Sequence, residues 1–199
     1  MLTAEARGVY LIAATPFRED GALDPTGLDR LLDWYLGHGI DGLTILGQLG
    51  EAPKLTAAET LEVMARALRR VDGRVPVVVG VSSPGHASLA ELAQAAMAQG
   101  AAGVMVAPPG TLRGDDAVLG YCREVERRLA GIPWVLQDFP LAGGPPMSAA
   151  LVRAIAVGGN FGAFKADVGK AACVQDLGAF HRFGGEGKTH FRLGGAQGH

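Results

Sequence analysis

Short apolar runs alternate with longer segments of helical periodicity along most of this chain, with a repeat of about 30 residues. The expected strands are residues 8–15, 40–47, 75–81, 101–107, 132–138 and 161–165. Continuous apolar strands separated by helices are buried on both faces, which is typical of a parallel sheet built from βαβ units. The alternation therefore excludes a helical bundle and a β-sandwich.

The segments between the expected strands carry clear helix signals. In residues 24–39, leucines and a tyrosine recur at i, i+3, i+4, i+7 and i+8, which places them on one face of a helix. Thr56 and Glu59 have the spacing of a capping box, and Gly73 marks the end of that helix. Further helices are expected over residues 86–99, 115–130 and 148–157.

Polar or special residues recur where the expected strands end. They are Thr15, Gln48, Ser82, Pro108, Gln137, Asp138 and Lys165. A (β/α)₈ barrel builds its active site from the carboxyl ends of successive strands, whereas an open sheet concentrates such residues at one switch point. No G-x-G-x-x-G follows the first strand and no G-x-x-x-x-G-K-[ST] occurs, so neither dinucleotide nor P-loop chemistry is indicated. We therefore predict an α/β fold of the TIM (β/α)₈ barrel type.

The end of the chain departs from this pattern. Residues 170–182 indicate at best a weak helix, and residues 188–193 indicate a doubtful strand. A (β/α)₈ barrel typically takes about 250 residues, so 199 residues predict an incomplete barrel of about six to seven βα units. We expect units one to six in residues 1–167, and an atypical tail or partial seventh unit in residues 168–199. A shortened barrel with an exposed edge and a damaged reading frame both remain open.

Composition narrows the class of function. The formal net charge is −2 and 48% of the residues are hydrophobic, which indicates neither a nucleic-acid-binding nor a membrane-binding surface. Cys122 and Cys173 form no disulfide framework and lack metal-ligand spacing, so we expect a cytoplasmic protein. The five histidines form no metal-binding pair. We expect no metal and no cofactor.

Lys165 directly follows the apolar run 161–164 in a chain with only three other lysines, Lys54, Lys170 and Lys188. One interpretation is a flanking residue whose ammonium group reaches solvent along an apolar stem. The other is an amine whose pKa is lowered by burial, so that it can attack a carbonyl group. The residue and its position alone leave both interpretations open.

Six segments, in order, resemble one family. They are AATPFREDGALD (13–24), GIDGLTILGQLGEAPKLTAAE (39–59), RVPVVVGVSS (74–83), GAAGVMVAPP (100–109), VLQDFP (135–140) and AFKAD (163–167). The chain resembles the dihydrodipicolinate synthase/N-acetylneuraminate lyase family, class I aldolases on a TIM barrel. The resemblance implies that Lys165 forms a Schiff base with a 2-oxo acid of the pyruvate type, and that the protein is a homo-oligomer.

The resemblance also assigns a role to the turn Gly47-Gln48-Leu49. In the family its counterpart binds the carboxylate of the 2-oxo acid through backbone N–H groups and two hydroxyls. Here the middle residues have no hydroxyl, but a glycine-flanked turn can direct its amides at an anion without them. The alternative is a tight turn that only closes the strand, anchored by Glu51. The two interpretations are compatible.

Gln137 is a departure from the family pattern. It stands where well-known members have a tyrosine that relays protons to the Schiff-base lysine, and glutamine is neither a general acid nor a general base. Gly110 or a neighbour replaces a second tyrosine, and the arginine that reads a second carboxylate falls near Ala142. Asp138 is either a base or a hydrogen-bonded turn residue. Dihydrodipicolinate synthase activity itself is therefore not expected.

The predicted function is a lyase or aldolase that acts on a 2-oxo acid through Lys165, with Gly47, Gln48, Leu49 and Gln137 at the substrate. The alternative is a catalytically impaired or inactive barrel fragment that acts, if at all, as an interaction module. A barrel isomerase with a phosphate site is a third class, but its phosphate loop comes from strands seven and eight, which the sequence does not indicate.

Overall fold

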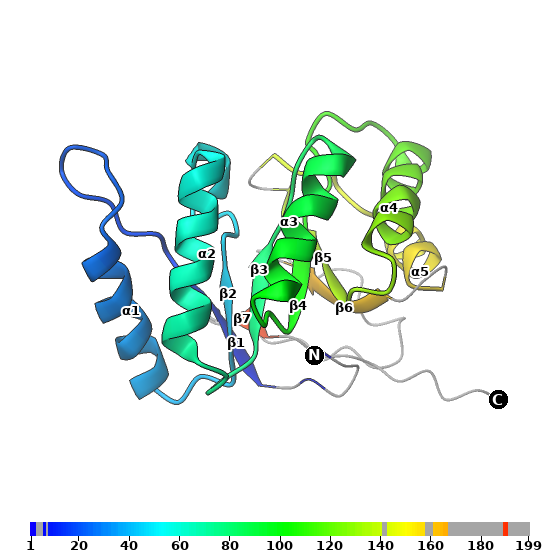
Figure 1. Ribbon diagram of the computed structural model, residues 1–199. Coiled ribbons are helices and arrows are strands. Elements are labelled where there is room, and N and C mark those ends of the chain that lie inside the picture. Colours follow the sequence, from blue (N-terminus) through cyan, green and yellow to red (C-terminus); the bar gives the residue numbers. More distant parts are fainter. Residues whose placement is uncertain (3–5, 7, 141–142, 158–160, 167–188, 191–199) are drawn as a thin grey trace.

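The computed structural model describes residues 1–2, 6, 8–140, 143–157, 161–166 and 189–190, and its centre is one curved sheet (Figure 1). The sheet has seven strands in the order β6-β5-β4-β3-β2-β1-β7. The strands are β1 (Val9–Ile12), β2 (Gly42–Ile45), β3 (Val77–Gly80), β4 (Gly103–Val106), β5 (Trp134–Asp138), β6 (Phe161–Ala166) and β7 (Thr189–His190). β1 to β6 pair in parallel and in sequence order, which confirms the predicted topology.

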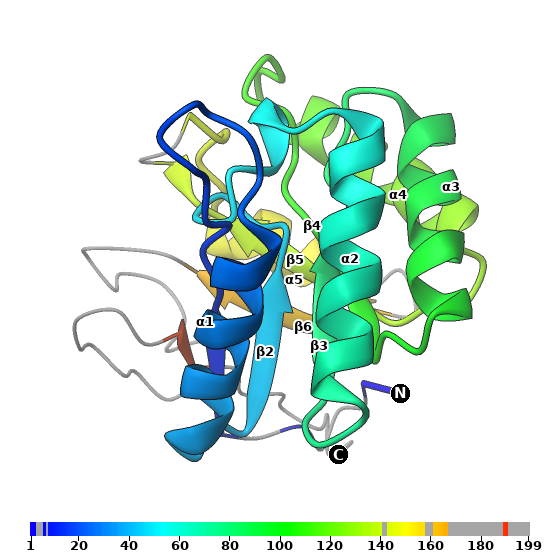
Figure 2. The same cartoon turned by 60° about the vertical axis from the view of Figure 1, so that its left-hand side comes forward.

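Five helices cover one face of this sheet (Figures 1 and 2). They are α1 (Pro25–Gly37), α2 (Ala57–Val71), α3 (His86–Ala98), α4 (Asp115–Leu129) and α5 (Ala149–Val157), with a short 3₁₀ helix η1 (Ala52–Lys54) before α2. Each helix follows one parallel strand and returns the chain to the start of the next, as in a TIM barrel. The predicted fold class, an incomplete barrel, is confirmed.

Local sequence signals determine where α1 and α2 begin. The Asp24 carboxylate accepts a hydrogen bond from the Gly27 N–H at 2.8 Å, and the proline that follows Asp24 has no N–H to satisfy. At α2 the predicted capping box is present. The Thr56 hydroxyl accepts from the Glu59 N–H at 3.2 Å, and the Glu59 carboxylate accepts from the Thr56 N–H at 2.8 Å.

Alternate residues of each strand form two separate apolar layers. Leu43 and Ile45 of β2 belong to the large cluster that includes the buried residues of the helices. Val78 and Met105 belong to a smaller cluster on the opposite, inner face of the sheet. Because successive side chains of a strand point to opposite faces, the helices occupy one face and leave the inner face for other contacts.

β7 pairs with β1 in the antiparallel direction, with Val9 opposite His190 and Tyr10 opposite Thr189. Of the strand predicted at residues 188–193, the structure describes these two residues. The helix predicted at residues 170–182 and Cys173 lie outside the described residues. The division of the chain at residue 167 therefore stays a prediction.

None of the helices in the described ranges combines the length and apolarity that a bilayer-spanning helix requires.

Two arginines of α2 join α1 through paired hydrogen bonds. Arg66 donates from Nε and Nη2 to the two oxygens of Asp29, both at 2.8 Å. One helical turn further, Arg70 binds Asp33 in the same two-pronged way, with its Nε 2.9 Å from Oδ1. Bidentate geometry adds direction to the attraction between the charges. The two pairs fix how α1 lies against α2.

The ion pair of Asp29 and Arg66 predicts how stability changes with pH. The hydrogen bonds from Arg66 hold the pKa of Asp29 below its ordinary value. A lowered pKa in the folded state stabilises the protein above the unfolded-state pKa, and this contribution is lost as the pH falls through the folded-state pKa. We expect Asp29→Asn to lower the thermal midpoint at pH 7 by about 2 °C.

In acid, where Asp29 is protonated in the folded and the unfolded state, the difference between this variant and the wild type should close. Glu19→Gln, which removes a carboxylate at an exposed position, is the control. Thermal unfolding measured at several pH values checks the prediction, and an equal loss of stability in both variants would contradict it.

Candidate active site

The connections that follow β1, β2 and β4 lie at one end of the sheet, the upper end in Figure 1. This is the end at which parallel strands of a barrel present their carboxyl termini. Thr15 follows β1, and its hydroxyl donates to the carbonyl oxygen of Gly50 at 2.7 Å. Ser82 follows β3, and its hydroxyl accepts from the Ala107 N–H at 2.8 Å. Both side chains therefore tie neighbouring connections together.

The turn after β2 begins with a residue in a strained backbone conformation, and its middle residues are exposed. Leu46 is buried and has a φ of 54°, a left-handed conformation that is costly for a leucine. Gly47 is buried, whereas Gln48 and Leu49 are exposed. The turn closes where the Glu51 N–H donates to the Gln48 carbonyl oxygen at 3.1 Å.

The amides of this turn are available to a ligand. The backbone N–H groups of Gln48 and Leu49 have no hydrogen-bond acceptor among the described residues. Glu51, which the sequence suggested as an anchor, pairs with Lys54 at 2.6 Å through its carboxylate. An exposed pair of amides between two buried glycines is an arrangement that can bind an anion.

Gln137 and Asp138 end β5, and both side chains are buried. In β6, Lys165 is paired in register with Gln137, and Ala166 with Asp138. Paired residues of parallel strands lie on the same face of the sheet. The structure therefore places Gln137 and Lys165 side by side at the end of the sheet from which the turn after β2 projects.

The inner face below these residues is almost entirely apolar. The lateral pairs there join Gly80 to Met105, Met105 to Val135, and Val135 to Ala163. Tyr10 is buried on the same face, and its pKa is raised by burial and by the negative charge of Asp41. Tyr10 therefore stays protonated at neutral pH and is a residue of the inner-face apolar cluster.

Sequence analysis missed Thr44. It is 0% exposed, and its hydroxyl has no hydrogen-bond partner within the described ranges of the chain. Its lateral partners are Ile12 and Val78, so Thr44 lies on the inner face. The available signal was a single hydroxyl residue inside the apolar strand GLTI.

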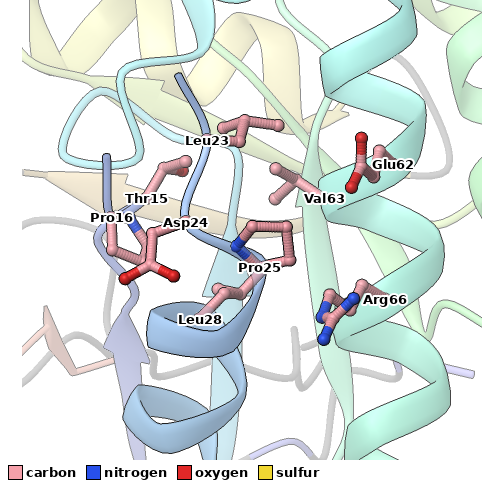
Figure 3. A pocket seen from close by; sticks show the side chains of 9 residues that line it. All are labelled: Thr15, Pro16, Leu23, Asp24, Pro25, Leu28, Glu62, Val63 and Arg66. Carbon is pink, nitrogen blue, oxygen red and sulfur yellow. The ribbon is translucent and has the colours of Figure 1, made fainter. Parts of the chain in front are cut away.

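Two cavities lie outside this face of the sheet. Figure 3 shows the smaller, about 10 Å³, between the chain before α1 and the first turns of α2. Its lining residues are Thr15, Pro16, Leu23, Asp24, Pro25, Leu28, Glu62, Val63 and Arg66. That volume suits about one water molecule. The cavity is therefore too small for an organic substrate.

The second cavity, about 70 Å³, lies where Cys122 of α4 meets Trp134 and Ile155. The indole N–H of Trp134 donates to Glu126 at 2.6 Å. Burial raises the pKa of Cys122 to about 12, so this thiol stays protonated and is a poor nucleophile. No group of three or more His, Cys, Asp or Glu side chains that could hold a metal occurs among the described residues.

Comparison with known proteins agrees with this geometry. The model of the dihydrodipicolinate synthetase family matches residues 5–180. The chain belongs to this family. The 4-hydroxy-tetrahydrodipicolinate synthase of Stenotrophomonas maltophilia (strain R551-3) is 37% identical over 171 residues, which are 85% of this chain and 57% of that protein.

Solved structures of the family share the fold. Dihydrodipicolinate synthase from Rhodopseudomonas palustris has a TM-score of 0.76 and 45% identity, over 80% of this chain and 53% of that chain. YagE, a prophage protein of the family from E. coli K12 solved in complex with pyruvate, has a TM-score of 0.74 and 31% identity, over 81% of this chain and 55% of that one. The chain thus spans between 53% and 57% of the length of these relatives.

The family consists of pyruvate-dependent Schiff-base lyases and aldolases, so this chain is homologous to class I lyases. The family recognised from the sequence motifs is confirmed. The roles predicted for Lys165, Gln137 and residues 47–49 stay predictions.

Gly80 gives a direct test of how the turn is held. A Cβ added at Gly80 would lie 2.0 Å from the carbonyl oxygen of Leu46, at the entry of the turn. The Leu46 carbonyl is a backbone group, so it cannot move away from the added atom as a flexible side chain could. We therefore expect Gly80→Ala to destabilise the protein by about 1–3 kcal/mol in chemical denaturation.

Gly120→Ala is the matched control. Gly120 lies inside α4 and a Cβ there meets nothing within 4 Å, so alanine should stabilise the helix by up to ~1 kcal/mol. Equal denaturation midpoints for the two variants would contradict the assigned contact.

Proposed function

We propose that this chain binds a 2-oxo acid of the pyruvate type and forms a Schiff base with it through Lys165, as a lyase or aldolase. The observation that carries the proposal is the register pairing of Lys165 with buried Gln137 at the carboxyl end of the parallel sheet. Membership of the family and the pyruvate complex of YagE support the choice of ligand.

The chemistry requires an unprotonated amine. A free lysine has a pKa near 10.4 and is almost wholly ammonium at pH 7, so it is a poor nucleophile. On the inner face, the neighbouring strands β5 and β4 present Val135 and Met105, with little polar surface to solvate a cation. Such surroundings disfavour the charged form and lower the pKa of an amine. In the proposed mechanism the unprotonated amine attacks the ketone, and loss of one water molecule gives an iminium. The iminium withdraws electrons from the adjacent carbon during C–C cleavage or formation.

The turn 47–51 supplies the second half of the proposed site. A 2-oxo acid carries a carboxylate next to its ketone, and the N–H groups of Gln48 and Leu49 have no acceptor among the described residues. These amides would hold the carboxylate while the amine attacks the ketone. The hydroxyls that the family adds at this turn are missing, so we expect weaker binding of the carboxylate than in such members.

Gln137 limits the rate in this mechanism. A carboxamide accepts and donates hydrogen bonds but does not exchange a proton at neutral pH. Each proton that the imine chemistry moves must then travel through water, because Asp138, the next residue of β5, lies on the opposite face of the sheet from Gln137. General acid–base catalysis contributes typically 10²–10⁴-fold. The proposal therefore includes slow turnover.

An inactive member of the family that works as an interaction module is the second candidate. The buried glutamine at 137 and the absence of hydroxyls at 48 and 49 favour it. A homo-oligomer is proposed in either case, on the family resemblance alone. Covalent trapping separates the two functions.

Trapping with pyruvate and borohydride is the test of Lys165. Reduction of the iminium should add a stable adduct to the peptide that contains AFKAD, located by mass spectrometry. Lys165→Arg should abolish this adduct, because a guanidinium stays protonated and forms no imine. Exposed Lys54, together with Lys170 and Lys188, provides internal controls. Equal labelling of all four lysines would refute the proposed function.

A gain-of-function variant tests the role of position 137. Gln137→Tyr supplies a phenol hydroxyl beside Lys165, where the family resemblance places a proton relay. We expect the exchange of pyruvate methyl protons for deuterium to accelerate by at least ~10-fold, with little change in the trapped fraction. Gln137→Phe, which has the ring without the hydroxyl, is the matched control. If the two variants exchange at the same rate, proton relay does not limit this site.

A further inference from the structure

The hydroxyl of Thr44 is a buried polar group without a structural explanation. Thr44 is 0% exposed, and its Oγ1 makes no hydrogen bond to the part of the chain that the structure describes. Removing a hydroxyl from water without giving it a partner costs free energy, and valine would fill the same volume without that cost. Thr15, which is also buried, has its partner in the Gly50 carbonyl oxygen at 2.7 Å. The hydroxyl of Thr44 therefore needs a hydrogen-bond partner other than the described groups of the protein.

The register of the sheet relates Thr44 to Lys165. Lys165 pairs with Gln137. Extending the register of each neighbouring strand pair beyond the strand ends leads from Gln137 across β4 and β3 to Gln48, which follows β2. This path runs along the hydrogen bonds, perpendicular to the strands. In a barrel this path does not stay at one height along the barrel axis, because the strands tilt by about 36° to that axis.

The tilt determines which residues lie at the same height along the barrel axis. In a barrel of eight strands with shear 8, the residue at a given height changes by about one position per strand, relative to the path along the hydrogen bonds. Because the strands have a right-handed tilt, that path rises toward the carboxyl end from β6 to β2. Four strand steps separate β6 from β2 in the sheet order. The residue level with Lys165 is then about four positions before Gln48, which is Thr44.

The register and the tilt of a complete barrel thus assign positions 44 and 165 to one layer. Such a layer takes its side chains from alternate strands, here Thr44 of β2, Met105 of β4 and Lys165 of β6. β2 and β6 stand four strands apart, on opposite walls of a barrel of eight. The interior of such a barrel is just wide enough for side chains to fill it. In this geometry a short threonine opposite a long lysine would leave room for a water molecule.

We propose that Thr44 is a positioning residue for Lys165, and that a water molecule between its hydroxyl and the lysine amine orients that amine. The inference rests on the proposed Schiff-base function. The water satisfies the Thr44 hydroxyl, which can donate and accept at once. It also solvates the ammonium form of Lys165 from below, while the turn 47–51 holds the carboxylate of the 2-oxo acid above.

The test measures the rate of adduct formation at saturating pyruvate across pH, in the wild type and in three variants. Thr44→Val and Thr44→Ala remove the hydroxyl, and Thr44→Ser keeps it. We expect the limiting rate at high pH to fall about tenfold in the first two and to stay within about twofold in Thr44→Ser, as for one lost hydrogen bond. The midpoint of the pH profile should shift to lower pH in Thr44→Val, because the water that solvates the ammonium group is lost.

Thr60→Val is the matched control, because the Thr60 hydroxyl bonds only to the Thr56 carbonyl oxygen of its own helix. Thermal unfolding of each variant shows that slow trapping does not come from loss of the fold. Thr44→Val could instead unfold at a higher temperature and be trapped with the wild-type rate and pH profile. The hydroxyl would then only destabilise the fold, and this result would refute the inference about Thr44 without affecting the proposed function. If the wild type itself forms no adduct at Lys165, the proposed function falls and takes this inference with it.

Discussion

The lateral register of the parallel strands is the constraint on which the candidate site depends. Each helix packs on the same face of the sheet, and this fixes which alternate residues of β2 to β5 face the inner side. A shift of one residue between β5 and β6 would take Lys165 away from Gln137 and move one of them to the helix side. The apolar residues that drive helix packing, such as Leu43 and Ile45, therefore also place the residues of the site.

The end of the sheet is held by backbone contacts more than by charges. The Leu46 carbonyl fits against Gly80, and the Thr15 hydroxyl binds the Gly50 carbonyl, so both sides of the turn are fixed by neighbouring strands. A pre-formed turn keeps its amides in place without paying for their ordering when an anion binds. The departures that the family resemblance implies, at positions 48, 49 and 137, are changes of side chain at this end of the sheet.

Much of the fold could be predicted from the sequence because its signals are local. Apolar strands, the capping box at Thr56 and Glu59, and the helical periodicity each follow from a few neighbouring residues, and all six parallel strands were predicted. The pairing of Lys165 with Gln137 needs the register between two strands, which no local pattern contains. The resemblance to the family identified both residues as candidates for the site without that information.

The environment of Thr44 could not be predicted from the sequence. A single threonine in an apolar strand is compatible with a surface-facing position, with an ordinary buried hydroxyl bonded to the backbone, and with an interior polar site. Its complete burial and its missing partner appear only once three strands are packed around it. The antiparallel direction of β7 was equally out of reach, because two residues carry no directional signal.

A crystal structure of the protein soaked with pyruvate tests the central claim most directly. The account predicts continuous electron density from Lys165 Nζ to the second carbon of pyruvate, with the carboxylate on the N–H groups of Gln48 and Leu49. Pyruvate bound elsewhere, or an amine at Lys165 that stays unmodified while the β5–β6 register is retained, would contradict it.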